Sequence, residues 1–439
     1  MIGRFTRLHR GCWLTVWFAV TPVVLAAPLT LDAVLTHADS AHPVLELARA
    51  QGELAQAEAQ LAQSLNDFRV NLDASLRTGR NPVFNDHFSP DHLIKLNARK
   101  TLLDFGRQQS GAAAAEEERE AHDLLIRDIR AHRRVSLMAR YFDVLLADMR
   151  DAAETESMAV AYVNWDNAKE RLAVGQMAQW QVAELESRFL ESLARRDDLR
   201  RGLREKRMAL GTAMNLPGML LDDLADPKLP DNERVLPTFD DLLAQMQTGN
   251  PRMAAQKRLL AAANQRLNGV RAENRPSIEF EAEAAAWSRD STTRDELRAG
   301  FNLVWPLWQG GRDAARLSRE QARFHALQAE HDQLLMELRQ SLLEAREEIQ
   351  YLRGAGRRSA ELNADFRDQA LDKARAEYEM ELKTNLGSSM AETQFAHLRR
   401  RGVEYRLALA WARLDALLGV PDASTKQPTT QTTVNMESK

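Results

Sequence analysis

Three glutamates alternate with small or apolar residues in the second half of this 439-residue chain. Residues two apart on a β-strand point to the same face, so Glu279, Glu281 and Glu283 would form one row of carboxylates. Such a row can attract cations. Basic residues in other alternating segments can instead neutralise it. The sequence therefore leaves two readings open, a cation preference or a face that is simply polar. The basic residues are Arg69, Lys95, Arg99 and Arg298.

The rest of the sequence offers no chemistry of catalysis or metal binding. The ten histidines lack the spacing of a metal site, and the single cysteine, Cys12, can form no disulfide within one chain. The sequence contains no nucleophile elbow, phosphate-binding loop or pair of carboxylates in a catalytic setting. We therefore predict a protein that is not an enzyme and uses no cofactor or metal.

Residues 1–26 have the pattern of a secretory signal peptide. Arg4, Arg7 and Arg10 precede an apolar run, and Ala26 ends a small-residue cleavage site. The alternative is an uncleaved anchor helix. Without these three of the 59 basic residues, 56 remain against 63 acidic ones, a net charge of about −7 that does not favour nucleic acid as a partner. No later apolar stretch reaches roughly 18 residues, so an exported chain that crosses a membrane would use strands.

Two pairs of segments switch to strict alternation, which predicts two hairpins of strands that are apolar on one side only. The first pair covers residues 67–77 and 94–99, and the second covers residues 278–284 and 297–305. Residues 78–92, rich in Gly, Pro, Asn and Asp, are predicted as a turn-rich connection. Aromatic residues that suit a membrane–water interface lie near the strand ends: Phe84, Phe88, Trp287, Trp305 and Trp308.

Very long helices are predicted between the strand pairs. Residues 106–173 contain no proline, and a helix of that length extends roughly 100 Å. Residues 29–66 are predicted as a shorter helix with Pro43 inside its first turns, and the chain returns as helix to residue 215 after one tip and over 387–418 after the other. Gly354 and Gly356 mark either a bend or a weakening of about 1 kcal/mol each. A coiled-coil seam is predicted at Leu334, Leu338, Leu342, Ala345, Ile349 and Leu352.

The sequence contains an internal repeat. Gly106-Arg107 recurs as Gly311-Arg312 after 205 residues, and Pro43 recurs as Pro251 after 208 residues. We predict a signal peptide over 1–26, a first repeat over 27–220, a linker over 221–237, a second repeat over 238–421 and a disordered tail over 422–439.

Four strands with one apolar face cannot cross a membrane alone, because their open edges would leave backbone groups unpaired in hydrocarbon. A closed barrel needs at least about eight strands, which two or three copies would supply. The predicted lipid face is Phe68, Val70, Leu72, Leu76, Ile94, Leu96, Ile278, Phe280, Phe301 and Leu303. The predicted barrel lumen is Arg69, Asn71, Asp73, Lys95, Asn97, Arg99, Glu279, Glu281, Glu283, Arg298 and Asn302. The alternative is a soluble sheet packed on a core.

At this point the sequence resembles the TolC-like outer-membrane efflux protein family, or outer membrane factors, over residues 29–419. The resemblance rests on the duplication, on Trp305-Pro306-Leu307-Trp308-Gln309-Gly310-Gly311-Arg312 with its partner Asp104-Phe105-Gly106-Arg107, on the Ala173-Val174-Gly175 tip and on the Ala416-Leu417-Leu418-Gly419 ending. It implies a mainly α fold with a β-barrel part: internally duplicated long helical hairpins plus four transmembrane strands per chain, assembled as a trimeric α/β-barrel.

The resemblance also implies a function. It predicts a homotrimeric, passive exit duct in the outer membrane of a Gram-negative bacterium, in contact with outer-membrane lipid and extending into the periplasm. Such a duct serves a tripartite efflux pump or a type I secretion system. It binds a periplasmic adaptor at its helical tips and works indirectly with an inner-membrane pump. The competing interpretations are a periplasmic adaptor, with one hairpin flanked by two halves of a β-rich domain, and a purely structural coiled coil.

The tips depart from the family pattern. Val174-Gly175 is present, but Gln181-Val182 stands where an Asp-Val pair is usual, so a ring of tip aspartates is not predicted. Either Glu379 or Glu381 substitutes for them, or both are solvated turn residues. Adaptor docking is predicted at Arg171, Leu172, Val174, Gly175, Gln176, Trp180, Tyr378, Glu381, Leu382, Lys383 and Thr384. Packing between neighbouring hairpins is the alternative for the apolar members. Asp104 is predicted to cap the following helix.

Overall fold

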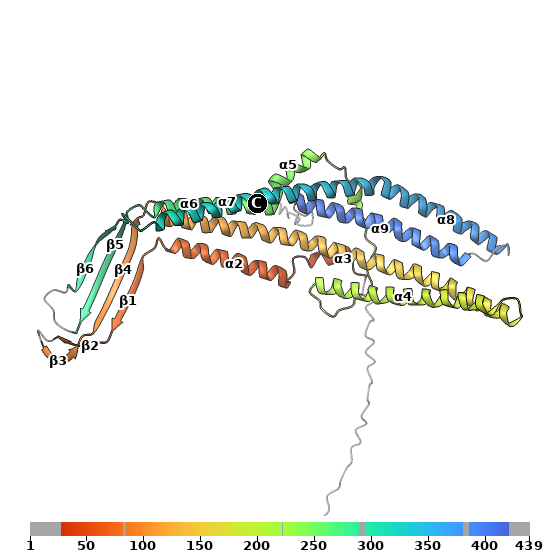
Figure 1. The fold of residues 1–439 in the computed structure, drawn as a ribbon, viewed down its shortest axis with the longest axis horizontal. Coiled ribbons are helices and arrows are strands. Elements are labelled where there is room, and N and C mark those ends of the chain that lie inside the picture. The colour runs from red at the N-terminus through yellow and green to blue at the C-terminus, as the bar shows by residue number, and fades with distance from the viewer. Residues whose placement is uncertain (1–27, 82–84, 222, 289–294, 381–385, 421–439) are drawn as a thin grey trace, which may run out of the picture.

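The molecule is a long helical body with a small antiparallel sheet at one end, bent away from the helix axis (Figure 1). The computed structural model describes residues 28–81, 85–221, 223–288, 295–380 and 386–420. The predicted signal peptide and tail, as well as Phe84 and Glu381 to Thr384, lie outside these ranges. Within them the predicted fold class, mainly helical with antiparallel strands, is confirmed.

The same order of helices and strands occurs twice. The first series consists of α1 (Leu31–Thr36), α2 (Pro43–Ser64), β1 (Arg69–Ser75), β4 (Leu93–Leu103), α3 (Arg107–Ala173) and α4 (Gln179–Ala213). After a 3₁₀ turn (Pro230–Glu233), the second series consists of α5 (Phe239–Gly249), α6 (Pro251–Ala272), β5 (Ser277–Trp287), β6 (Leu297–Val304), α7 (Arg312–Tyr351), α8 (Arg357–Glu379) and α9 (Leu386–Leu418).

Two sequence predictions about the first half were wrong in detail. Residues 78–92 are not only a turn-rich connection, because β2 (Thr78–Asn81) and β3 (Asn85–Pro90) pair there as a separate two-stranded sheet. Residues 29–66 are two helices rather than one. Pro43 is the first residue of α2, where its missing N–H breaks no helical hydrogen bond.

The helices pack around α3, which has 67 residues and is the longest helix that the structure describes. Near the sheet, α2 and α6 pack on α3, and α7 packs on α6. Towards the tips, α4 and α9 pack on α3, and α8 packs on α9. The two apolar core clusters include residues of α1 and α5, which lie against these long helices at mid-length (Figure 1). The predicted seam from Leu334 to Leu352 is confirmed, since all six of its residues are buried.

A π-helical turn, Leu352–Gly356, joins α7 to α8. Leu352 and Gly356 in this turn and Ala360 and Ala364 after it are buried, each four positions after the last. Steps of four overshoot the 3.6 residues of an α-helical turn, so a seam of this spacing would rotate away from its partner. A π-helical turn, with i→i+5 hydrogen bonds, contains more residues than an α-helical turn and so keeps residues spaced by four on the buried side. Gly354 and Gly356 therefore mark a local change of helix type.

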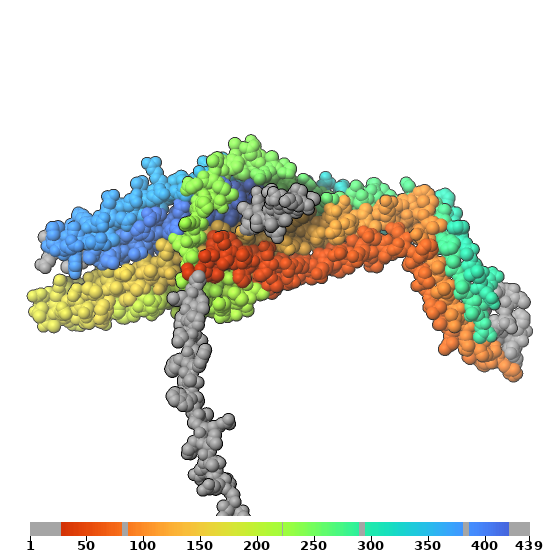
Figure 2. Space-filling view, turned by 180° about the vertical axis from the view of Figure 1, so that it is seen from behind, coloured from red at the N-terminus to blue at the C-terminus, as the bar shows by residue number. Residues whose placement is uncertain are grey.

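The segment between the two series is fastened across the helices. Leu224 of this segment pairs with Leu29, just before α1, through an isolated bridge, and the hydroxyl of Tyr141 donates to the carbonyl oxygens of Leu29 and Ala225. Figure 2 shows this segment crossing the face of the body that also carries α1. Further along, Glu404 of α9 accepts from Arg357 Nε and Nη2, at 2.7 and 2.8 Å, and also accepts from Asn232.

Candidate functional site

The four-stranded sheet has the order β1-β4-β5-β6, so its centre joins the two halves of the chain and its edges are β1 and β6. Val70 lies opposite Ala98, Leu72 opposite Leu96, and Ala74 opposite Ile94. The same face continues into β5 and β6, where Ala282 lies opposite Ala98 and Phe280 lies opposite Phe301. Residues directly opposite share a face, so the predicted lipid-face residues in the strands lie on one side of the sheet.

This apolar face is largely uncovered. Leu72, Phe301 and Leu303 expose 67%, 74% and 63% of their surface. Ile278 and Phe280, in the central strand β5, are half-buried. The edge of Phe68, just before β1, meets Phe280 with ring centroids 6.4 Å apart. The remaining predicted members are exposed: Val70, Leu76, Ile94 and Leu96.

Sequence analysis missed one charged residue on this face. Lys100 lies opposite Phe280, and its Nζ sits 4.9 Å from the centroid of the Phe68 ring. The alternation itself contained the signal, because residue 100 has the same parity as Leu96 and Ala98. Lys100 lies at the end of β4 next to the helices, where a long side chain can turn its ammonium group towards water.

The opposite face carries the predicted lumen residues and a ladder of ion pairs. Glu281 accepts from Asn97 at 2.8 Å and from Arg99 Nε and Nη2 at 3.1 and 2.8 Å. Glu283 pairs with Lys95 at 3.5 Å and with Arg298 at 3.3 Å. Two of the three glutamates are thus neutralised across the strands, and Asn97 is buried between them.

The other predicted lumen residues of the strands lie on the same face. Glu279 lies opposite Asn302, Arg69 opposite Arg99, and Asn71 opposite Asn97. Asp73 lies opposite Lys95 on the same face. Both charge signs therefore alternate along the polar face, which favours the simply polar alternative over a purely acidic stripe.

Each transition from strand to helix uses two consecutive residues in the left-handed backbone region. They are Phe105 and Gly106, with φ of 55° and 87°, and Gly310 and Gly311, with φ of 61° and 80°. Glycine adopts this region without steric cost. Asp104 accepts from the backbone N–H of Gly106 at 3.0 Å and of Gln108 at 2.8 Å, so its predicted capping role is confirmed.

The first helical tip is a tight turn with exposed apolar side chains. Gly175 has φ of 73°, its N–H donates to Leu172 and the N–H of Gln176 donates to Arg171, which satisfies the last carbonyls of α3. Val174 and Trp180 expose 69% and 68% of their surface. Arg171 and Gln176 are also exposed, whereas Leu172 is half-buried.

At the second tip the described chain ends at Met380 and resumes at Leu386. Tyr378 and Met380 expose 53% and 59% of their surface, and Glu379 is exposed at the end of α8. Of the predicted docking residues at this tip, Tyr378 alone falls within the described chain. Both tips lie at the end of the body opposite the sheet, so the predicted docking residues and the two-faced sheet are two separate sites (Figure 1).

Comparison with solved structures identifies the fold, whereas no family model and no curated protein sequence matches the chain. The outer membrane protein VceC of Vibrio cholerae superposes with a TM-score of 0.72 at 19% identity, covering 89% of this chain and 96% of that one. The chain has the TolC-like outer-membrane channel fold. The CmeC outer membrane channel of Campylobacter jejuni gives a TM-score of 0.74 at 15% identity, covering 90% of this chain and 87% of that one.

A third structure with the TolC-like fold is the open state of the MtrE outer membrane channel of Neisseria gonorrhoeae, with a TM-score of 0.67 at 17% identity, covering 89% of this chain and 88% of that one. One hairpin between two halves of a β-rich domain, which the adaptor interpretation requires, is not the arrangement of the described residues. Within the described ranges, no helix is long and apolar enough to cross a membrane.

Proposed function

We propose that this chain is the passive outer-membrane exit duct of a tripartite efflux pump or a type I secretion system. The observation that carries the proposal is the sheet, which is apolar and uncovered on one face and charged but balanced on the other. A soluble sheet would cover its apolar face with a core. A sheet that faces lipid outwards and water inwards needs this division.

The edges of the sheet support a homotrimer. β1 and β6 each pair on one side only, and backbone groups left unpaired in hydrocarbon cost several kcal/mol each. Three copies joined from β6 to β1 would close a twelve-stranded barrel, and the helical layers would continue it as a tunnel through the periplasm. Trp305 and Trp308, 58% and 87% exposed beside the sheet, suit the membrane–water interface.

The tips are the proposed contact with a periplasmic adaptor, which would link the duct to an inner-membrane pump. Val174 and Trp180 are exposed at the first tip and Tyr378 at the second. Large apolar side chains exposed at the end of a helical hairpin fit a partner better than they fit water. In this proposal the outer membrane is that of a Gram-negative bacterium.

Electron microscopy of the protein extracted in detergent from outer membranes tests the proposal. We expect a particle with threefold symmetry, longer than the roughly 100 Å that the longest helix alone spans, with a barrel at one end. A monomer recovered from the soluble periplasmic fraction would overturn both the duct and the trimer.

A further inference from the structure

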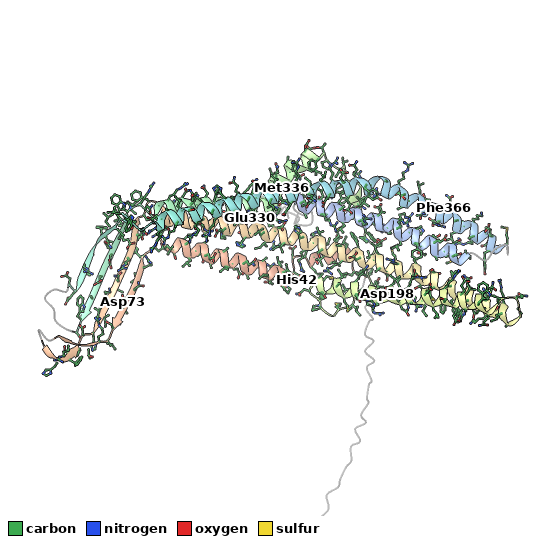
Figure 3. The ribbon with its side chains drawn as sticks, in the orientation of Figure 1. His42, Asp73, Asp198, Glu330, Met336 and Phe366 are labelled. Carbon is green, nitrogen blue, oxygen red and sulfur yellow. The ribbon has the colours of Figure 1, made fainter. Side chains whose placement is uncertain are left out.

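A hollow of about 730 Å³ lies at mid-length of the body, where α2 begins and α4 ends against α3. His42, which precedes the first residue of α2, stands at this junction (Figure 3). Val44, Ile129 and Ala209 supply apolar walls, and most of the lining surface is apolar. The size is that of pockets which enclose small organic molecules.

The charged groups of the hollow are mostly cationic. The guanidinium group of Arg133 already has partners within the chain, because it donates hydrogen bonds to the carbonyl oxygens of Ala38, His37 and Ala213 at 3.0, 2.9 and 3.1 Å. Among the described residues of the lining, Asp128 alone is acidic, and it pairs with His132 at 3.3 Å.

Two other arginines of the lining have guanidinium groups without such partners among the described residues. Arg140 of α3 and Arg252 of α6 line the hollow and form no ion pair or side-chain hydrogen bond with any residue that the structure describes. The N-terminus of α2 opens onto the same space and adds a partial positive charge. A guanidinium binds carboxylate, sulfate and phosphate groups through paired N–H donors.

The hollow lies on the side of α3 that continues the polar face of the sheet. Gln108 Nε2 donates to Thr101 Oγ1 at 3.0 Å, and Thr101 lies opposite Glu279 on that face. Ile129 and Ser136, which line the hollow, follow Gln108 by three and four steps of seven residues. Each step drifts about 20° around a helix, so both residues lie within roughly a quarter turn of Gln108.

The opposite side of α3 faces the segment between the two halves of the chain. Arg134 and Met138 line a second hollow there together with Leu229. The first hollow therefore opens away from this segment. If the proposed duct is correct, the first hollow opens to its passage.

We propose that this hollow binds an amphiphilic organic anion, with its acidic head between Arg140 and Arg252 and its apolar body along Val44, Ile129 and Ala209. Binding itself depends only on these residues. The further role of the hollow as a resting place for cargo rests on the proposed function.

Isothermal titration calorimetry of the full chain in phosphatidylcholine nanodiscs tests the proposal, with empty nanodiscs as background. The probes are octanoate and n-octylammonium, which share a chain length and differ in the sign of the head group. We expect octanoate to bind more tightly, and the double variant Arg140→Gln, Arg252→Gln to weaken it at least about tenfold, because hydrogen bonds between charged partners are the stronger class.

Arg358→Gln is the matched control, since Arg358 is an exposed arginine of α8 outside the hollow. We expect that variant to bind octanoate as the parent does. Equal binding of both probes, no binding of octanoate, or equal loss in the control and the double variant would overturn the site. A protein that prefers octanoate but forms no threefold particle would retain the site and reject the duct.

Discussion

Leu72 and Asn71 are adjacent residues of β1 that face opposite sides of the sheet, which allows the proposed lipid face to be tested by one substitution. Leu72 is 67% exposed and lies opposite Leu96, so replacing it removes little packing within the chain. An arginine near the middle of the lipid face of a barrel costs about 2–4 kcal/mol. Three copies of Leu72→Arg should then destabilise a trimer by about 6–12 kcal/mol.

Asn71→Arg is the control, because it adds the same side chain on the polar face, opposite the uncharged Asn97. The assay is the fraction of each variant that reaches the outer membrane as a trimer stable in detergent, measured by native electrophoresis. We expect Leu72→Arg to lose most of this fraction and Asn71→Arg to keep it. Equal assembly of the two variants would refute the assignment of the faces.

Three further predictions concern the helical body. Glu404→Ala should lower the free energy of unfolding by about 1.5–3 kcal/mol, because the half-buried guanidinium of Arg357 then keeps only its ion pair with the exposed Glu233. An unchanged thermal midpoint would contradict this. Gly249→Ala should lower the free energy of unfolding by about 1–3 kcal/mol, because its new Cβ would lie 2.3 Å from a backbone oxygen of α9. In Gly202→Ala the new Cβ meets nothing within 4 Å, so that variant should be neutral or stabilising. Similar thermal midpoints for the two variants would refute the close approach at Gly249. Burial raises the pKa of Tyr141 to about 12, so the stability it contributes is complete below pH 10, the ordinary pKa of tyrosine, and is lost as the pH rises towards 12. Tyr141→Phe should reduce the loss of unfolding free energy between pH 10 and 12, measured by alkaline unfolding. An identical pH profile for the variant would contradict the raised pKa of Tyr141.

The features that the sequence predicted correctly are those with a strict period. Alternation assigns strand residues to one face or the other because a strand repeats every two residues, and the pairing of β1 with β4 and of β5 with β6 keeps these faces together. The seam from Leu334 to Leu352 was predictable for the same reason, since the core of a coiled coil repeats every seven residues.

The features that the sequence did not predict depend on contacts or on ambiguous residue types. β2 and β3 were missed because Gly79 and Pro90 belong equally to turns and to short edge strands. The break before α2 was missed because Pro43 suits a first turn as well as a first residue. The hollow with Arg140 and Arg252 is built from four helices distant in sequence, so no local pattern indicates it.

The π-helical turn between α7 and α8 has a mechanical consequence for the proposed trimer. α3 reaches the first tip as one uninterrupted helix of 67 residues, whereas the helix leading to the second tip contains the turn at Leu352–Gly356 with two glycines. A force applied at the tips would therefore travel through a stiff rod in one hairpin and through a compliant joint in the other. Around the mouth of the proposed trimer, stiff and compliant hairpins would alternate, so the opening would yield at three points rather than six.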